Sequence, residues 1–161
     1  MASNVPIIRQ IAWMSTIPHI FILGLLIGIY HFFGFAEPTL WGALTMIALS
    51  FGLKALITKD HLQGIQLVKQ KKFAEAIAFF EKSVAYFSKN RWIDKYRFWT
   101  LLSSSKMGYR EMGMCNIAFC YGQIGEGLKA KELYQQVLNE YPDNGLASVA
   151  LNMLNSVIKN D

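Results

Sequence analysis

Two long runs of hydrophobic residues near the start are the clearest pattern along this chain. Residues 17–35 contain no Lys, Arg, Asp or Glu, and residues 39–57 contain only Lys54. Each run has nineteen residues, and an α-helix of that length covers about 28 Å, close to the ~30 Å hydrocarbon core of a bilayer. We predict two transmembrane helices, at about 17–35 and 39–57, joined into a hairpin by the short turn at 36–38.

The two runs have two other interpretations, as buried core helices or as a cleaved signal peptide. Both helices could be buried in a protein core, but a domain of this size has too little interior for two helices that are hydrophobic on every face. The first run could instead belong to a cleaved signal peptide, with Gly34 and Ala36 at a candidate cleavage site. Against this, the region before the run is long and a second run follows directly. We therefore interpret residues 1–58 as a membrane anchor.

The pattern changes to amphipathic helices of period 3.6 after residue 58. Phe73, Ile77, Phe80 and Val84 fall at helical spacing, with charged residues outside that stripe. Residues 145–159 add a last helix that is expected to cover the exposed end of the domain. The sequence therefore predicts an all-α protein, in which the hairpin precedes a small helical domain at 59–161.

Small residues and large aromatics recur in the same order in two parts of this domain. In residues 111–144, the small residue of the first helix is Ala118, and a turn at Gly125 precedes the second helix. This order resembles the tetratricopeptide repeat (TPR), a 34-residue pair of helices. The residues that carry the resemblance are Ala118, Tyr121, Gly125, Ala130, Tyr134 and Pro142 in this unit, and Gly64, Leu67, Ala76, Phe80 and Ser83 in residues 57–90.

The match to the repeat has departures. Residues 57–90 have Lys71 and Ser88 where the turn Gly and the closing Pro are expected, Val137 replaces a small residue in the later unit, and neither unit has the early Trp. Gly64 and Ala118 are 54 residues apart instead of 34, which places an inserted segment at 91–110. Three aromatic residues and Ile93 share one helical face beside basic residues, and this face either lies on a membrane interface or packs into the core: Trp92, Ile93, Tyr96 and Trp99.

The resemblance implies that the first helices of the units form a concave face that binds peptide segments. Its mostly apolar side chains would suit an amphipathic helix or a hydrophobic peptide. The same residues could instead pack against the inserted segment or a second copy of the chain. The residues implied at this face are His61, Leu62, Ile65, Val68, Lys69, Met112, Cys115, Asn116, Phe119 and Gln123.

Charge is unevenly distributed. The 161 residues are 53% apolar and 17% charged, against about 25% charged in soluble domains. Residues 59–110 hold eleven basic and four acidic residues, whereas residues 111–161 hold three and six. The basic segment would be attracted to anionic lipids, and no nucleic-acid motif accompanies it. Arg9 and the lysines after the second run predict that both termini face the cytoplasm, in a bacterial inner membrane.

Small residues also recur within the two runs. Gly24 and Gly28 form a GxxxG motif, and Ala48 and Gly52 repeat that spacing. Such residues let helices approach closely. They predict packing between the two helices or against a partner, which includes the possibility of a homodimer.

Residue patterns for catalysis are weak. Cys115 and Cys120 are five residues apart, about 140° around a helix, so they cannot share a metal, and we expect two reduced, buried thiols. Ser103 and Lys106 match the S-x-x-K motif of serine acyl-enzymes, but its companion motifs S-D-N and K-T-G are missing from the sequence. We predict no catalytic residue, metal or cofactor.

These patterns lead to one functional hypothesis and one alternative. The hypothesis is a non-enzymatic, membrane-anchored TPR adaptor that binds a protein or peptide partner at the cytoplasmic membrane face. The alternative is a small structural or assembly subunit of an integral membrane complex, such as a transporter or membrane enzyme, which acts through its transmembrane helices.

Overall fold

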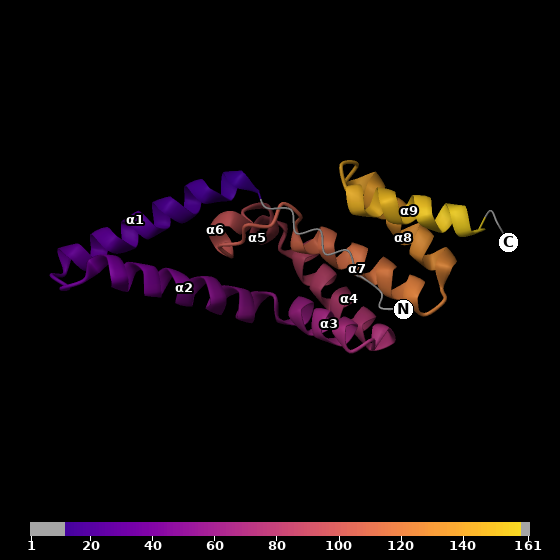
Figure 1. The fold of residues 1–161 in the computed structure, drawn as a ribbon, viewed down its shortest axis with the longest axis horizontal. Coiled ribbons are helices and arrows are strands. Elements are labelled where there is room, and N and C mark those ends of the chain that lie inside the picture. The colour runs from indigo at the N-terminus through magenta and orange to yellow at the C-terminus, as the bar shows by residue number, and fades with distance from the viewer. Residues whose placement is uncertain (1–11, 159–161) are drawn as a thin grey trace. The chain divides into compact units, whose positions relative to one another are not determined.

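The computed structural model describes residues 12–158. Arg9 and residue 159, which enter the predictions above, lie outside them. Within this range all regular secondary structure is helical (Figure 1), which confirms the predicted all-α fold. In chain order the elements are η1 (Trp13–Ser15), α1 (Thr16–Phe32), α2 (Pro38–Ile57), α3 (Lys59–Lys69), α4 (Phe73–Lys89), α5 (Arg91–Lys95), α6 (Arg97–Thr100), α7 (Tyr109–Gln123), α8 (Gly127–Glu140) and α9 (Gly145–Ile158).

The described chain divides into two compact bodies. The hairpin body contains residues 12–59 together with residues 90–106, which we call the insert. The repeat body contains residues 60–89 and 107–158. The insert therefore interrupts the repeat helices in sequence but is part of the same body as α1 and α2.

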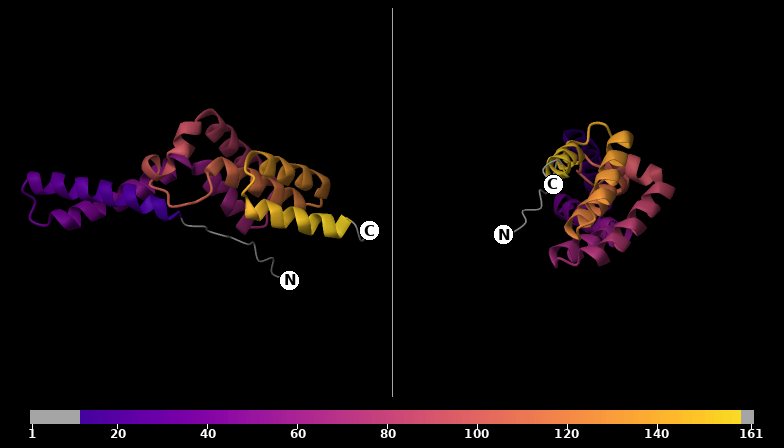
Figure 2. Two further views of the ribbon diagram at one scale, coloured as in Figure 1. Left: turned by 90° about the horizontal axis from the view of Figure 1, so that it is seen from above. Right: turned by 90° about the vertical axis from the view of Figure 1, so that its right-hand side faces the viewer.

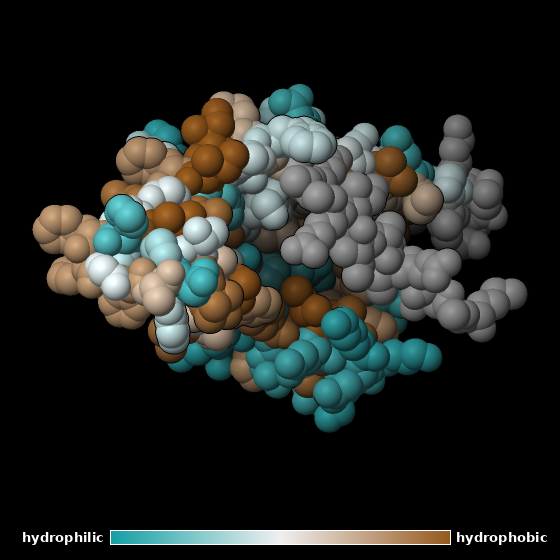
Figure 3. Space-filling model, turned by 60° about the vertical axis from the view of Figure 1, so that its left-hand side comes forward, coloured by the Kyte–Doolittle hydropathy of each residue, from teal (hydrophilic) through white to brown (hydrophobic). Residues whose placement is uncertain are grey.

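The two hydrophobic helices form a hairpin, meeting at the turn and diverging toward the start of α1 and the end of α2 (Figure 1); Figure 2 shows the same hairpin from above. The stretches Trp13–Phe32 and Pro38–Ile57 are each 20 residues long, enough by length and composition to cross a membrane. Only 11% and 6% of their most hydrophobic windows is buried. Apolar side chains are therefore exposed where the hairpin comes forward in the space-filling view (Figure 3).

The contact between α1 and α2 is made at a glycine that the sequence analysis did not single out. A Cβ atom placed on Gly42 would lie 2.8 Å from Cγ1 of Ile27, so only glycine fits this approach. Nearby, the hydroxyls of Tyr30 and Thr45 are hydrogen-bonded at 2.7 Å. This bond satisfies two polar groups within helices that are mostly apolar.

The repeat body is built from two helix pairs, α3 with α4 and α7 with α8. A Cβ atom on Gly64 of α3 would come within 2.7 Å of the Phe80 ring of α4, so the missing side chain makes room for the aromatic. In the later pair, Tyr134 is likewise buried in the core that contains Ala118. Small residues thus admit large ones at matching positions of both pairs.

The two pairs pack directly on each other although the insert separates them in sequence. At the contact between α4 and α7, a Cβ atom on Gly113 would lie 2.6 Å from Cγ2 of Val84. Phe73 of α4 also meets Phe119 of α7 edge to face, with ring centroids 6.0 Å apart. The two pairs therefore pack together although the chain leaves the repeat body after residue 89 and returns at residue 107.

Equivalent turns join the helices of each pair. Gly125 adopts φ +85° between α7 and α8, and Lys71 adopts φ +61° between α3 and α4. These residues are 54 positions apart, the same offset as Gly64 and Ala118. Lys71 thus adopts a left-handed conformation that favours glycine, because the turn of the repeat requires it.

Substitutions at Lys71 and Gly125 test whether the turn requires a left-handed residue. Left-handed backbone costs an L-residue about 1–2 kcal/mol, whereas glycine loses about 0.5–1 kcal/mol through its greater freedom when unfolded. We expect Lys71→Gly to raise the free energy of unfolding by about 0.5–1 kcal/mol, and Gly125→Ala to lower it by about 1 kcal/mol. Urea unfolding of the full chain in detergent micelles, followed by far-ultraviolet circular dichroism, measures both. A loss of stability in Lys71→Gly would contradict this account of the turn.

Candidate partner-binding face

The candidate face is the surface formed by the first helix of each repeat pair, α3 and α7. The structure places its predicted residues at different depths. Leu62 is 42% exposed, whereas His61 is only 2% exposed. Lys69 and Gln123 are exposed, and Ile65, Asn116 and Phe119 are half-buried.

His61 lies inside the repeat body, not on its surface. Its Nδ1 is 3.4 Å from the Ser83 hydroxyl of α4, and its ring meets Phe80 and Tyr109 edge to face. Burial lowers the pKa of this imidazole to about 4 by disfavouring the charged form. A neutral His61 therefore connects α3 to α4 inside the repeat body.

Ile65 and Phe119 are half-buried residues at the base of the face. Both pack against the buried cluster that includes Leu67, Phe80 and Ile117. Part of each side chain remains accessible. Their role in the stack means that the more exposed residues around them are the better positions for testing binding.

Helix α9 also carries exposed apolar residues beyond the two helix pairs. Helix α9 packs on the core cluster formed by α7 and α8, much as a further first helix would. Residues 34 positions after Cys115 and Phe119 are Val149 and Met153, and these side chains are 52% and 64% exposed. Continuing the 34-residue period beyond the second pair would have identified them.

Asn144 fixes the start of α9 against α7. Its side-chain oxygen accepts a hydrogen bond from the Ala147 N–H at 2.8 Å, which caps the helix. Its Nδ2 donates to the Glu111 carboxylate at 2.8 Å and lies 3.5 Å from the Cys115 sulfur. Because Asn144 is buried, these bonds determine where α9 begins.

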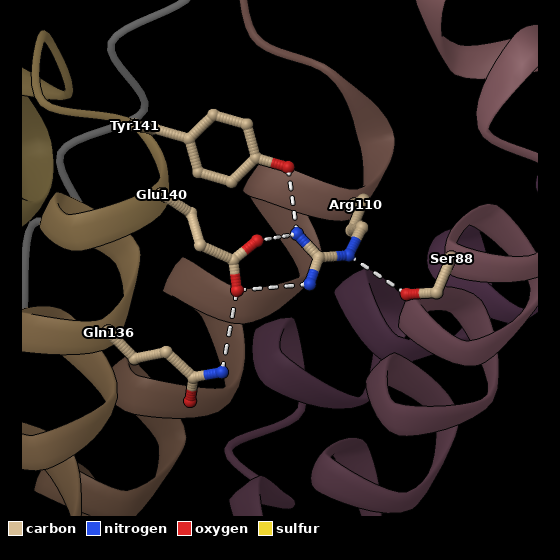
Figure 4. Close-up of polar contacts among 5 residues, drawn as sticks. All are labelled: Ser88, Arg110, Gln136, Glu140 and Tyr141. Atoms are coloured by element: carbon tan, nitrogen blue, oxygen red, sulfur yellow. Dashed lines mark hydrogen bonds and ion pairs between the residues drawn. The ribbon is translucent and has the colours of Figure 1, made fainter.

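Arg110 joins three helices on another side of the repeat body (Figure 4). Its Nε donates to the Ser88 hydroxyl at 2.8 Å, and its Nη2 donates to the Glu140 carboxylate at 3.1 Å. Its Nη1 reaches the same carboxylate and also donates to the Tyr141 hydroxyl at 2.9 Å. The bond to Glu140 raises the pKa of Arg110 above its usual range. This bidentate pair helps to hold α4 and α8 against α7, which carries part of the face.

The candidate catalytic groups lie in environments that do not activate them. Ser103 is buried and its oxygen accepts a hydrogen bond from the Ser105 N–H at 3.4 Å, whereas Lys106 is exposed. Cys115 and Cys120 are both buried as free thiols. Burial raises the pKa of each thiol to about 12, so both remain protonated and unreactive near neutral pH.

Comparison with known proteins supports a repeat of this kind. A family model described as tetratricopeptide repeat matches residues 114–144, which covers most of α7 and all of α8. No curated protein matches the chain. No solved structure matches it either. The chain is thus TPR-like, and tetratricopeptide repeats in general bind protein segments.

Burial of His61 predicts a pH dependence. In the unfolded chain its pKa is about 6.5, whereas in the folded chain it is about 4. Between these values the unfolded state binds more protons, so the stability falls as the pH falls. We expect this group to contribute a loss of about 3 kcal/mol between pH 7.5 and pH 4. Urea unfolding in micelles at several pH values measures this loss.

The variant His61→Gln isolates the contribution, because it removes the titrating group and keeps a polar side chain near Ser83. Its stability should vary less with pH than that of the wild type. Parallel curves for the wild type and His61→Gln would contradict the assignment.

Proposed function

We propose that this protein is a membrane-anchored TPR adaptor. In this proposal α1 and α2 span the bacterial inner membrane as a hairpin, and the repeat body is held at the cytoplasmic face. There it binds a segment of another protein. It has no catalytic role.

The anchor is supported by the length and exposure of the two helices. A soluble chain would bury most of such residues, but Ile17, Phe51 and Leu56 are all largely exposed. Lipid would cover these side chains. The lysines at and after the end of α2, Lys54 and Lys59, support the cytoplasmic orientation.

The observation that carries the binding role is the group of exposed apolar residues on the first helices. Leu62 on α3 and Val149 and Met153 on α9 are well exposed, although each helix buries other apolar residues in the stack. A helical stretch that presents its own apolar stripe would cover them and remove that surface from water. We therefore propose an amphipathic helix or hydrophobic peptide as the bound segment.

The face is tested at its most exposed residue. Met153→Asp should weaken partner binding by about tenfold or more, because burial of a Met side chain contributes about 1.5–3 kcal/mol. A photo-crosslinker at residue 62 or 153 of the full chain, in its own membranes, should give the same protein adduct by mass spectrometry. Leu128 provides the matched control: it is 71% exposed but lies on α8, a second helix.

Leu128→Asp should leave binding and the crosslinked adduct unchanged. Equal losses in Met153→Asp and Leu128→Asp would contradict a specific face. Circular dichroism should show that both variants keep the helical content of the wild type, since neither side chain is buried.

The second candidate function, assembly through the membrane helices, is favoured by unoccupied space beside three glycines. A Cβ atom on Gly24, Gly28 or Gly52 would have nothing within 4 Å, and Ala48 is exposed. Since α1 contacts α2 through Gly42, these residues are available to a helix of another protein or of a second copy.

This candidate has its own test. Gly24→Leu with Gly28→Leu should leave the hairpin intact, because no neighbouring atom obstructs the new side chains, but should dissociate any complex that packs there. Blue native electrophoresis of solubilised membranes measures the size of the complex. An unchanged size would exclude this surface, and loss of the complex in this variant together with unchanged binding in Met153→Asp would favour assembly over adaptor function.

A further inference from the structure

The insert is bound to the beginning of α1. The Ala12 N–H donates to the Ser104 carbonyl at 2.9 Å, and Nε2 of His19 is 3.1 Å from the Leu102 carbonyl. Trp99 meets Phe21 edge to face, with ring centroids 5.9 Å apart. These hairpin partners all lie within or just before the first two turns of α1, so the insert occupies one end of the hairpin.

Arg97 links the first and last parts of the insert through hydrogen bonds to three backbone carbonyls. Its Nε donates to the Ser105 carbonyl at 3.0 Å, and its Nη1 donates to the Asp94 carbonyl at 3.1 Å. Its Nη2 also reaches the Lys106 carbonyl. The first and last parts of the insert are thus held together, which gives its outer side chains a defined arrangement.

Three large aromatics remain on the outside of this closed segment. Trp92, Tyr96 and Trp99 are 60%, 52% and 48% exposed, whereas Ile93, Leu101 and Leu102 are buried. The insert therefore has an interior of its own, and the aromatics are not that interior. Trp and Tyr side chains are favoured at the boundary between lipid and water.

Basic residues surround these aromatics. Arg91, Lys95 and Lys106 are exposed, and with Arg97 they outnumber Asp94, the only acidic residue of the insert. The net charge of +3 matches a surface of anionic lipid. Each basic residue close to such a surface strengthens binding by about fivefold.

We propose that the insert is a lipid-binding platform, in which Trp92, Tyr96 and Trp99 enter the headgroup region and Arg91 and Lys95 bind anionic headgroups. This inference rests on the proposed anchor, because the start of α1 is at the membrane surface only if α1 crosses the membrane. The membrane interface is then continuous with the outer side of the insert. The platform would hold the insert beside the lipid.

Tryptophan fluorescence tests the platform in the full chain. The protein is reconstituted into vesicles of zwitterionic phosphatidylcholine, with or without anionic phosphatidylglycerol, and some acyl chains carry bromine near the headgroup as a quencher. One variant keeps only Trp92, because Trp13, Trp41 and Trp99 are replaced by Phe. A second keeps only Trp41, in the first turn of α2, and reports on the anchor alone.

We expect Trp92 to be quenched in vesicles that contain phosphatidylglycerol and less quenched without it. Adding Arg91→Gln and Lys95→Gln should lower the equilibrium constant for docking of the insert by about 25-fold and reduce the quenching. Adding Lys129→Gln and Lys131→Gln, which remove the same charge from α8, should not. Trp41 should be quenched in every case.

The two reporters separate failure of the platform from failure of the anchor. If Trp41 is quenched and Trp92 is not, the anchor stands and the platform is excluded, so the exposed aromatics must contact protein instead. If Trp92 is quenched equally with and without anionic lipid, recognition of anionic headgroups is excluded. If Trp41 is not quenched, the proposed anchor fails and the platform fails with it.

Discussion

The repeat body depends on the direct packing of α4 against α7. Gly113 allows Val84 to approach at a distance that no side chain on residue 113 would permit, and Arg110 bonds to Ser88 beside the same pair of helices. Because the entropic cost of closing a loop rises only slowly with its length, the insert adds only a modest cost to this contact. The insert can therefore form a separate structure without loosening the stack.

Most of the fold follows from patterns that are local in sequence. Hydrophobic runs at 17–35 and 39–57 correspond to α1 (Thr16–Phe32) and α2 (Pro38–Ile57), because helix length and apolar composition are properties of each run alone. The repeat was recognisable because Ala76, Phe80, Ala118, Ala130 and Tyr134 must be small or aromatic for the helices to pack, and all five are buried. The residue type at each of these positions is determined by side-chain packing within one helix pair.

What the sequence did not predict concerns contacts between segments that are distant in sequence. A helical period places His61 on one side of α3, but only the tertiary structure shows that Phe80 and Tyr109 cover it. Likewise, glycine spacing suggested Gly24 and Gly28 for helix packing, whereas α1 contacts α2 at Gly42, where the Ile27 side chain leaves no room for a Cβ atom. Lys71 stands at the turn position of the repeat, but a lysine does not itself favour positive φ. Its left-handed conformation follows from the repeat and not from the residue type. The aromatics of the insert were ambiguous between surface and core for the same reason.

The division into two bodies also separates the chromophores of the protein. All four tryptophans, at 13, 41, 92 and 99, lie within the hairpin body, whereas the repeat body contains none. Intrinsic emission excited at the red edge of the absorption band therefore comes from the hairpin and the insert alone, without any label. Unfolding of the repeat helices will be visible in the peptide absorption region while the indole signal stays constant, so one unmodified sample gives two independent optical readouts.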